Sequence, residues 1–360
     1  MKQSNLEFRL AWGWNDFFEK QLKDSDQIIG RVVGEEKDRW RVQVSATATV
    51  WSELPGKYRY QSHSRMDLPS VGDWISCKYE EHQAVALVQK VFARKSCMYR
   101  KAVGGGGAAQ ILASNIDFAF ILTSVNADMN IARLERYVSL AWDSGAIPVL
   151  CVTKAELSEN LEDLLENLRG EFPGIGVHAF SVKEKIGLQN LDPYIAAGKT
   201  VVFVGSSGVG KSTLTNHLLG KDVLQTQEIR ESDDRGKHTT TARYLFPTDN
   251  GAFVIDTPGM RMLSLMDQED GVDTLFSDLA ELENACRFGD CQHRTEPGCA
   301  VLSALENGAL DENRWNRYQK LKRELQRKQI SEDRVKQRQA REKLKKQQKE
   351  MYEHIKMKRR

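Results

Sequence analysis

Short β-prone runs, broken by turn residues, dominate the first hundred positions of the chain. This pattern predicts five strands, at Ile28 to Val33, Trp40 to Val50, Lys57 to Gln61, Asp73 to Tyr79 and Ala84 to Val91. Five strands of this length suit a small closed sheet, because closure leaves no unpaired strand edge. We therefore expect a β-barrel domain over residues 1–100.

The size of this barrel suits an OB-like fold, which often binds oligonucleotides through one face. Stacking and phosphate contacts are available from Arg39, Trp40, Arg41, Tyr58, Arg59 and Tyr60. Trp40 and Tyr58 can equally be core or cross-strand residues.

From about residue 110 the pattern changes to apolar strands that alternate with helical segments. The predicted strands are Asn115 to Leu122, Pro148 to Val152, Val177 to Ser181, Thr200 to Val204, Arg243 to Phe246 and Ala252 to Ile255. The predicted helices are Ile131 to Asp143, Leu157 to Leu168, Leu188 to Ala196 and one that begins at Lys211. This alternation predicts a parallel sheet in an α/β domain over residues 110–275, after a flexible joint at Gly104 to Gly107.

Beyond this domain the sequence becomes helical and cysteine-rich, and then strongly basic. We expect a helical metal-binding domain over residues 276–312, followed by a tail over 313–360 with one helix and a disordered end. The last fifty residues hold 19 Lys+Arg against 8 Asp+Glu, although the whole chain carries only +2. A basic arm of this kind favours contact with nucleic acid, and a solvated helix without a partner is the alternative. Deletion after Glu312 is expected to weaken RNA binding.

The sequence contains no apolar run near the roughly 18 residues of a membrane span, and its start does not resemble a signal peptide. Cys77, Cys97 and Cys151 lie far apart, which favours reduced thiols over a disulfide framework. We therefore expect a cytoplasmic protein without a membrane partner.

A phosphate-binding motif follows the predicted strand at Thr200. Its residues are Gly205, Ser206, Ser207, Gly208, Val209, Gly210, Lys211 and Ser212, which match G-x-x-x-x-G-K-[ST] between a strand and a helix. Lys211 can reach the β- and γ-phosphates, Ser212 can ligate Mg²⁺, and Thr213 joins the nucleotide contacts on the same helical turn. The motif predicts a nucleoside triphosphate site.

Two further segments are expected to meet the γ-phosphate. Asp256 ends a strand and can hold the metal through water, while the Gly259 N–H faces the phosphate. Thr240 in the Gly-Lys-His-Thr-Thr-Thr segment is the expected switch ligand of Mg²⁺, although one of these threonines can simply start the next strand. Met260 cannot orient water, so we predict His238 for that role; an RNA contact or a solvated histidine is the alternative.

Base recognition is expected at two other strand ends. Thr153, Lys154, Ala155 and Glu156 resemble the [NT]-K-x-D guanine motif, and Ser181, Val182 and Lys183 resemble its companion S-A-K loop. The carboxylate in such a motif accepts hydrogen bonds from guanine N1 and N2. Glu156 replaces the usual Asp, so an adenine site stays open, as does an ordinary residue in the first turn of a helix.

A cluster of soft ligands lies in the cysteine-rich segment. Cys286, Cys291, His293 and Cys299 form the pattern C-x₄-C-x-H-x₅-C, which suits tetrahedral Zn²⁺. Four protein ligands leave no open position, so the predicted role is structural. Buried cysteines without metal, beside a surface histidine, are the alternative.

The order of these motifs is unusual, because the base motifs precede the P-loop. With a barrel before them and the cysteine cluster after them, residues 30–310 resemble the circularly permuted small ribosomal subunit biogenesis GTPases, the RsgA family. The resemblance implies a monomeric GTPase that binds the 30S subunit and 16S rRNA in late maturation. It would use GTP, Mg²⁺ and Zn²⁺, and hydrolyse GTP with stimulation by the subunit. The catalytic set would be His238, Lys211, Thr240 and Asp256. A P-loop ATPase or kinase and a non-enzymatic RNA-binding protein are the alternative functions.

Overall fold

The computed structural model describes residues 2–22, 27–36, 39–62, 64–78, 85–100, 109–125, 129–220, 243–256, 270–327 and 330. The chain divides into two compact units, Met1–Arg100 with Ala109–Met266, and Lys101–Ala108 with Asp267–Arg360. Among the described residues, no helix combines the length and the apolar character that a membrane crossing requires.

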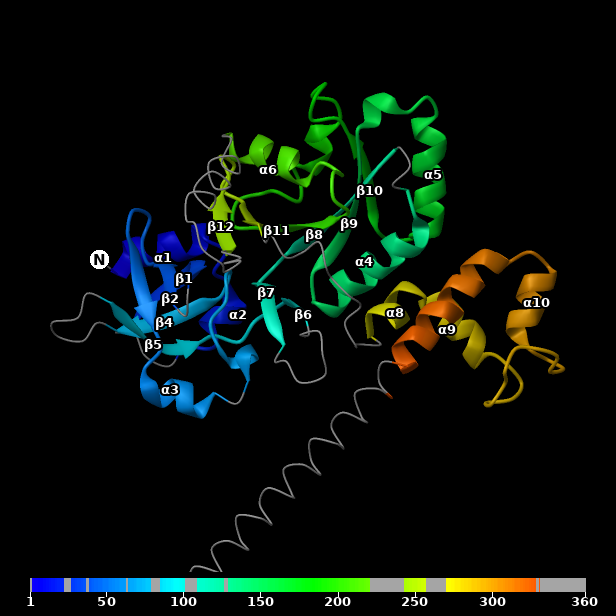
Figure 1. Ribbon diagram of the computed structural model, residues 1–360, viewed down its shortest axis with the longest axis horizontal. Helices are drawn as coiled ribbons and strands as arrows, with labels where there is room; N and C mark the ends of the chain where they lie inside the picture. The colour runs from blue at the N-terminus through cyan, green and yellow to red at the C-terminus, as the bar shows by residue number, and fades with distance from the viewer. Residues whose placement is uncertain are drawn as a thin grey trace, which may run out of the picture. The chain divides into compact units, whose positions relative to one another are not determined.

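The first unit contains a closed five-stranded barrel near its N-terminus (Figure 1). Its strands are β1 (Ile28–Glu36), β2 (Arg39–Gln43), β3 (Thr49–Glu53), β4 (Trp74–Lys78) and β5 (Ala86–Val91). Strand β1 pairs with both β2 and β4, and the parallel pairing of β3 with β5 completes the ring. The predicted barrel is therefore confirmed, in the strand order of an OB-like fold.

Two of the predicted barrel strands were wrong in detail. The run from Trp40 to Val50 is a hairpin, because its turn closes with a hydrogen bond from the Val44 N–H to the Ala48 carbonyl at 3.0 Å. The segment from Lys57 to Gln61 is helix α3 (Gly56–Gln61), not a strand. Pro55 precedes it at the N-cap, and the Ser62 N–H closes its last turn on the Tyr58 carbonyl.

Two helices that the hydrophobic pattern does not predict precede the barrel. They are α1 (Lys2–Ala11) and α2 (Asp16–Glu19), the second capped by the Asn15 side chain, which accepts from the Phe17 N–H. The Trp14 ring meets the rings of Trp74 and Phe92 edge-on, with centroids 5.0 and 5.2 Å apart. This aromatic cluster packs α2 against β1 and β4 of the barrel, through Ile29 and Trp74.

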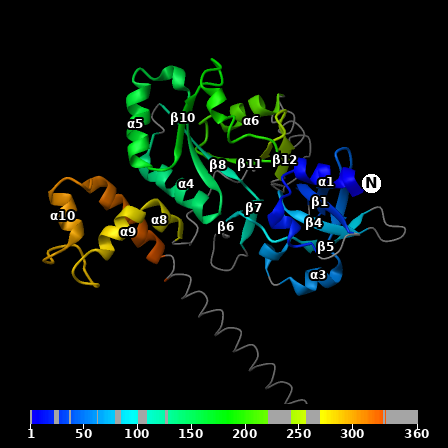
Figure 2. The same cartoon turned by 180° about the vertical axis from the view of Figure 1, so that it is seen from behind.

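The predicted α/β sheet is confirmed. Its parallel strands, in spatial order, are β10 (Gly176–Phe180), β9 (Ile147–Thr153), β8 (Phe118–Ser124), β11 (Thr200–Gly205) and β13 (Phe253–Asp256). Helix α4 (Ile131–Asp143) packs against β8 and β9, α5 (Leu161–Glu171) against β10, and α6 (Lys211–Leu219) against β11 (Figure 2). The helix predicted over Leu157 to Leu168 is α5, which the short 3₁₀ turn η2 (Ala155–Leu157) precedes. The helix predicted over Leu188 to Ala196 is instead the 3₁₀ turn η3 (Leu188–Leu191).

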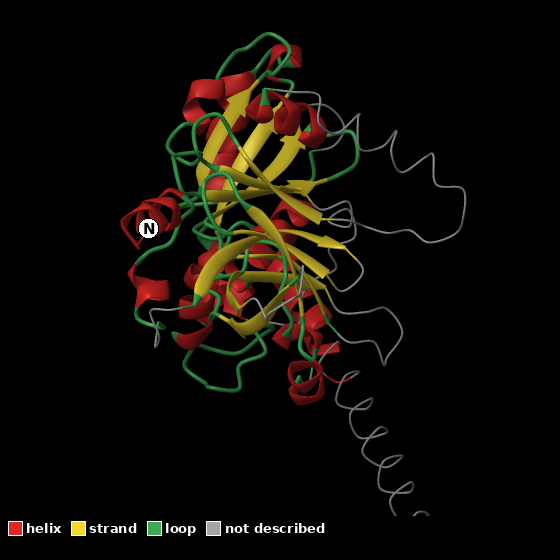
Figure 3. Cartoon of the chain, turned by 90° about the vertical axis from the view of Figure 1, so that its left-hand side faces the viewer, coloured by secondary structure: helices red, strands yellow, loops and turns green. Residues whose placement is uncertain are grey.

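Strand β12 (Arg243–Pro247) runs antiparallel to β13, because a tight turn over residues 248–252 joins the two. Its other edge pairs with β1 of the barrel, with Gly34 opposite Tyr244 and Glu35 opposite Arg243. The strands of the barrel and of the α/β domain therefore form one continuous sheet of eleven strands (Figure 3).

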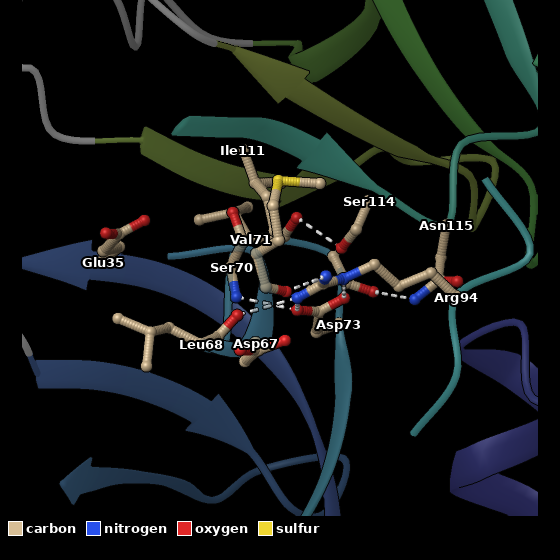
Figure 4. A network of polar contacts seen from close by, with 12 residues as sticks. Glu35, Asp67, Leu68, Ser70, Val71, Asp73, Arg94, Ile111, Ser114 and Asn115 are labelled. Carbon is tan, nitrogen blue, oxygen red and sulfur yellow. Dashed lines mark hydrogen bonds and ion pairs between the residues drawn. The ribbon is translucent and has the colours of Figure 1, made fainter. Parts of the chain in front are cut away.

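Polar side chains that are mostly buried stabilise the junction between the barrel and the α/β domain. Arg94 forms a forked ion pair with Asp73 at 2.8 and 2.7 Å, and Ser114 and Asn115 donate to the carbonyls of Val71 and Gly72, each at 3.0 Å (Figure 4). Ser114 ends β7 (Gln110–Ser114), which pairs with β6 (Cys97–Arg100) in a small sheet that the sequence does not predict. The glycine run between these two strands lies outside the described residues.

A buried arginine completes the junction. Arg31 of β1 donates to the Thr200 hydroxyl at 2.6 Å and to the Trp12 carbonyl at 2.7 Å. Burial lowers the pKa of Arg31 to about 10, so the guanidinium stays charged at neutral pH. Thr200 begins β11, the strand that leads into the phosphate loop.

The second unit is helical, as predicted. It contains α8 (Asp270–Leu275), α9 (Ser277–Asn284), α10 (Ala300–Glu306) and a helix over residues 312–327. Its small core is formed by buried side chains of Leu279, Val301, Trp315, Tyr318, Leu321 and Leu325. The predicted disordered end of the tail lies outside the described residues.

Candidate nucleotide site and metal centre

The phosphate loop joins the central strand β11 to helix α6. Gly205, Gly208 and Gly210 have φ values of +150°, +77° and +102°, which favour glycine. A Cβ atom at Gly205 would lie 2.5 Å from the Leu122 carbonyl oxygen, so a larger residue does not fit. A tight glycine turn before a helix N-terminus is the arrangement that presents backbone N–H groups to phosphate.

One face of the loop is anchored in the core, and the other is exposed. Val209 is buried in the hydrophobic cluster under the loop, whereas Ser207, Ser212 and Thr213 are exposed. Lys211 donates from Nζ to the Gly205 carbonyl at 2.6 Å and to the Ser206 carbonyl. The loop thus fixes the ammonium group of Lys211 at the start of α6, where Ser212 and Thr213 have exposed hydroxyls.

The first base motif lies directly against this loop. The Thr153 hydroxyl, at the end of β9, hydrogen-bonds with the Val209 carbonyl at 2.7 Å and with the Thr123 carbonyl at 3.1 Å. Since β8, β9 and β11 are parallel, their carboxyl ends meet at the same edge of the sheet. Segments that lie 56 residues apart in the sequence therefore form one site.

The chain turns sharply after Thr153. Lys154 has a left-handed backbone with φ of +58°, and Ala155 is buried. This conformation is uncommon for a residue with a side chain, and it occurs most often at functional sites. It brings Glu156 to the exposed edge of the sheet.

The second base motif contacts the first. A hydrogen bond from Ser181 is the main cause that lowers the pKa of Glu156 below its usual value, and Lys183 and Lys154 act in the same direction. The Glu156 carboxylate is therefore ionised at neutral pH and held at the carboxyl end of β10. It can accept hydrogen bonds from a base, as the motif requires.

Backbone hydrogen bonds shape the loop that carries Ser181. Ser181 and Ile186 exchange a pair of them at 2.9 and 3.1 Å, and the Ser181 hydroxyl accepts from the Glu184 N–H at 3.0 Å. Val182 packs on the hydrophobic core, and Lys183 is exposed and pairs with Glu184 at 3.3 Å. The seven residues of the two base motifs thus lie at one edge of the sheet.

Some predicted site residues are not placed. His238, Thr240 and Gly259 lie outside the described residues, so their roles stay predictions. Asp256 is the last residue of β13, at the same edge of the sheet as Gly205, and its side chain is also outside the described part. Among the described residues, the candidate magnesium ligand here is the Ser212 hydroxyl.

The four predicted zinc ligands converge in the second unit. The donor atoms of Cys286, Cys291, His293 and Cys299 all lie within 4.8 Å of one another. His293 presents Nδ1 to the sulfurs of Cys286 and Cys299, at 3.5 and 3.4 Å. These separations fit four donors around one tetrahedral ion, and the chemistry of the set suits Zn²⁺.

The N-terminus of α10 supports the thiolates. Burial disfavours the Cys286 thiolate, but the N–H groups of Val301 and Ala300, together with hydrogen bonds to Cys299 and Cys291, outweigh it, so the pKa of Cys286 lies below its usual value. The Cys299 sulfur caps the same helix by accepting from the Leu302 N–H at 3.4 Å. Donors and a helix dipole that face sulfur favour the deprotonated form that binds metal.

The barrel face differs in part from the prediction. Trp40 is buried in the barrel core, so it cannot stack on a nucleotide. Arg39 and Arg41 are exposed on β2, and the Arg41 guanidinium lies 5.8 Å from the exposed Trp51 ring of β3. Tyr58 is half-buried and Tyr60 is 90% exposed, while the Arg59 side chain is outside the described part.

Comparisons with known proteins agree with this site. A family model described as RsgA GTPase matches residues 91–266, and one described as 50S ribosome-binding GTPase matches residues 200–356. A protein of Lactiplantibacillus plantarum named small ribosomal subunit biogenesis GTPase RsgA 2 is 43% identical over 84% of this chain and 85% of its own length. The chain belongs to the RsgA GTPase family. It is therefore a GTP-hydrolysing enzyme, as the P-loop and the base motifs predict.

Another relative and two solved structures extend the comparison. A Methanosarcina acetivorans protein named small ribosomal subunit biogenesis GTPase RsgA is 40% identical over 87% of the chain and 84% of its own length. The crystal structure of YjeQ from Thermotoga maritima matches with a TM-score of 0.62 and 26% identity, over 83% of this chain and 98% of that one. YloQ, described as a circularly permuted GTPase, matches with a TM-score of 0.61.

Sequence reasoning missed two contributors to these sites. Thr153 was assigned to the base, but its hydroxyl also fixes the phosphate loop through Val209. Glu283 approaches the imidazole of His293 at 3.6 Å, and no motif contains it. Its position three residues before Cys286 on a helix was the available signal.

Proposed function

We propose that this chain acts in late maturation of the small ribosomal subunit, binding the 30S particle and 16S rRNA in the GTP state and leaving after hydrolysis. The Thr153–Val209 hydrogen bond carries the proposal, because it unites base and phosphate motifs in the permuted order. Relatives that are 43% and 41% identical to this chain are named small ribosomal subunit biogenesis GTPases. The proposed enzyme is cytoplasmic and monomeric.

Hydrolysis proceeds by in-line attack of water on the γ-phosphate. Lys211 and the loop N–H groups stabilise the charge that develops on the phosphoryl oxygens. Ser212 and Thr240 would hold Mg²⁺, with Asp256 acting through water, and the ion would supply further positive charge at the phosphates. The proposed role of Gly259 is a contact from its N–H to the γ-phosphate. The base lies along Lys154 and meets the Glu156 carboxylate.

Zinc at Cys286, Cys291, His293 and Cys299 stabilises the helical unit in this proposal. The fit of the four donor atoms within 4.8 Å supports it. A closed set of protein ligands serves folding and not catalysis.

RNA contacts are proposed on the barrel and in the basic tail. On the barrel, Arg41 beside the exposed Trp51 combines a charge with a stacking surface. In the tail, residues 328–360 hold 13 Lys+Arg against 5 Asp+Glu. Both features suit a phosphate backbone with unpaired bases.

GTP turnover with and without purified 30S particles tests the proposed partner and activity together. We expect slow turnover by the enzyme alone and strong stimulation by the particles. Equal GTP turnover with and without 30S particles would show that the 30S subunit does not activate the enzyme. No hydrolysis in either would leave a protein that only binds nucleotide.

A competition titration of GTP against ATP tests base selectivity. Glu156 has one methylene more than the usual Asp, but its position beside Ser181 is compatible with a guanine contact. We expect a clear preference for GTP. Equal affinities would support an adenine-tolerant P-loop enzyme instead.

His238→Ala should suppress subunit-stimulated turnover by about 10²–10⁴-fold, the usual contribution of a positioned proton-transfer group. Nucleotide affinity should be unchanged, because base and phosphates are held elsewhere. Rapid-quench turnover on 30S particles and equilibrium binding measure the two quantities. A parent-like stimulated rate would exclude His238 from the mechanism.

Truncation of the tail should weaken rRNA binding and flatten its dependence on salt. Each lost phosphate contact is expected to lower the slope of log affinity against log salt by about 0.7–0.9. A cut after Glu312 is unsuitable, because Trp315 and Tyr318 are part of the helical core. The chain should therefore be truncated after Arg327. An unchanged slope of log affinity against log salt would show that the tail does not contact RNA.

A further inference from the structure

The carboxylate of Glu283 lies between the proposed zinc ligands and the helix over residues 312–327. Glu283 belongs to α9 and is mostly buried, with 16% of its side chain exposed. Oε1 lies 3.6 Å from Nε2 of His293. Oε2 accepts from the Tyr318 hydroxyl at 2.9 Å and pairs with Lys322 Nζ at 2.7 Å. One side chain thus contacts both a ligand and the helix.

The orientation of His293 gives this contact a function. Its Nδ1 faces the sulfurs of Cys286 and Cys299, so Nδ1 is the nitrogen in the donor set. An imidazole that binds metal through Nδ1 carries its proton on Nε2, the nitrogen that faces Glu283. A carboxylate at that position fixes the tautomer and the orientation of the ring. At 3.6 Å the two atoms are farther apart than the roughly 2.7–3.2 Å of a hydrogen bond, so zinc binding is expected to bring Nε2 and the carboxylate closer together.

The helix side of the contact is tightly packed. Trp315 meets the His293 ring edge-on, with centroids 5.4 Å apart and an interplanar angle of 85°. Tyr318 is 1% exposed, and burial together with the Glu283 carboxylate raises its pKa to about 12. Its hydroxyl therefore keeps its proton and donates to Glu283 at neutral pH. Leu321 and Leu325 continue the same buried face.

We propose that Glu283 is a positioning residue for zinc and couples metal binding to the docking of the helix over residues 312–327. The proposal rests on the zinc site proposed above. In this proposal zinc binds His293, the Glu283 carboxylate orients the His293 ring, and the same carboxylate contacts Tyr318 and Lys322 of the helix. The coupling is reciprocal, so a weakened helix contact lowers zinc affinity, and loss of zinc loosens the helix. That helix leads directly into the basic residues 328–360.

Zinc affinity of the full chain, measured by competition with a chromophoric chelator, tests the proposal. Glu283→Gln should weaken zinc about 10–100-fold, as outer-shell substitutions do. Tyr318→Phe keeps the ring and removes the donor, so it should weaken zinc by a smaller factor. Glu281→Gln is the matched control, since it makes the same change of charge at an exposed position of α9, the helix that carries Glu283. It should leave zinc affinity unchanged.

Amide hydrogen exchange of residues 312–327, with and without zinc, supplies the second readout. Zinc removal should speed exchange there in the parent chain, and much less in Glu283→Gln, where the coupling is already broken. Parent-like zinc affinity in both Glu283→Gln and Tyr318→Phe would overturn the proposal, and so would equal weakening by Glu281→Gln. A parent chain without bound zinc would overturn the zinc site itself, which is a separate result.

Discussion

Replacement of Lys211 by alanine is expected to reduce GTP turnover about 10²–10³-fold, the usual cost of removing one preorganised donor to a developing charge. Lys211 already lies against the loop through Gly205 and Ser206, so its ammonium is positioned before nucleotide arrives. Affinity for GTP should fall as well, because ground state and transition state both carry phosphate charge. Single-turnover hydrolysis and equilibrium nucleotide binding measure the two effects.

Lys199→Ala is the control for this experiment. Lys199 directly precedes the opposite end of β11 and makes a long ion pair with Asp117 at 3.8 Å, a contact worth about 0–1 kcal/mol at most. It should turn over GTP at the parent rate. A Lys211→Ala protein with parent activity and a parent-like circular dichroism spectrum would exclude the loop as the phosphate site.

Cys299→Ser should remove zinc and unfold the helical unit, while the α/β sheet stays folded. Structural zinc supplies about 10–16 kcal/mol in small domains, and the core of residues 270–327 is small. Serine is itself a good N-cap, so the N-cap of α10 is kept. Any loss of folding in this variant is therefore due to the loss of the metal. Metal content and amide exchange, resolved by segment, measure the outcome.

Cys97→Ser changes a thiol outside the cluster and should keep one zinc per chain. Its pKa is raised to about 11, chiefly by burial, so this thiol is not a ready ligand. Full zinc content and unchanged exchange in Cys299→Ser would contradict the proposed metal centre.

The α/β sheet was predictable because its strands are buried on both faces. Strands of this kind are short continuous apolar runs, and β8, β9 and β11 are almost entirely buried. The antiparallel direction of β12 was not predicted, since its hydrophobic run does not reveal which way it pairs. Its tight turn to β13 determines the direction.

The barrel shows where local patterns mislead. Tyr58 and Tyr60 alternate with charged residues, which indicates a strand, but Gly56–Gln61 is helical. Six residues are too few to separate a period of 2 from one of 3.6. The small sheet of β6 and β7 was missed because its strands pair across a long connection rather than a short turn.

The chemistry of the sites followed from motifs, but their connections did not. Glycine spacing predicts a phosphate loop, and cysteine spacing predicts a metal site, because each ligand set is local in sequence. The hydrogen bond of Thr153 to Val209 and the ion pair of Lys322 with Glu283 join residues 56 and 39 positions apart. Such contacts depend on tertiary packing, which spacing does not encode.

The pairing of β1 with β12 has a practical consequence for protein engineering. A shortened chain that starts at residue 109 would keep the nucleotide motifs but uncover the outer edge of β12. Arg243 and Tyr244 would lose Glu35 and Glu36, their partners at 3.4 and 2.9 Å. An uncovered strand edge invites self-association. A stand-alone nucleotide-binding fragment therefore requires charged or proline substitutions along β12 to stay monodisperse.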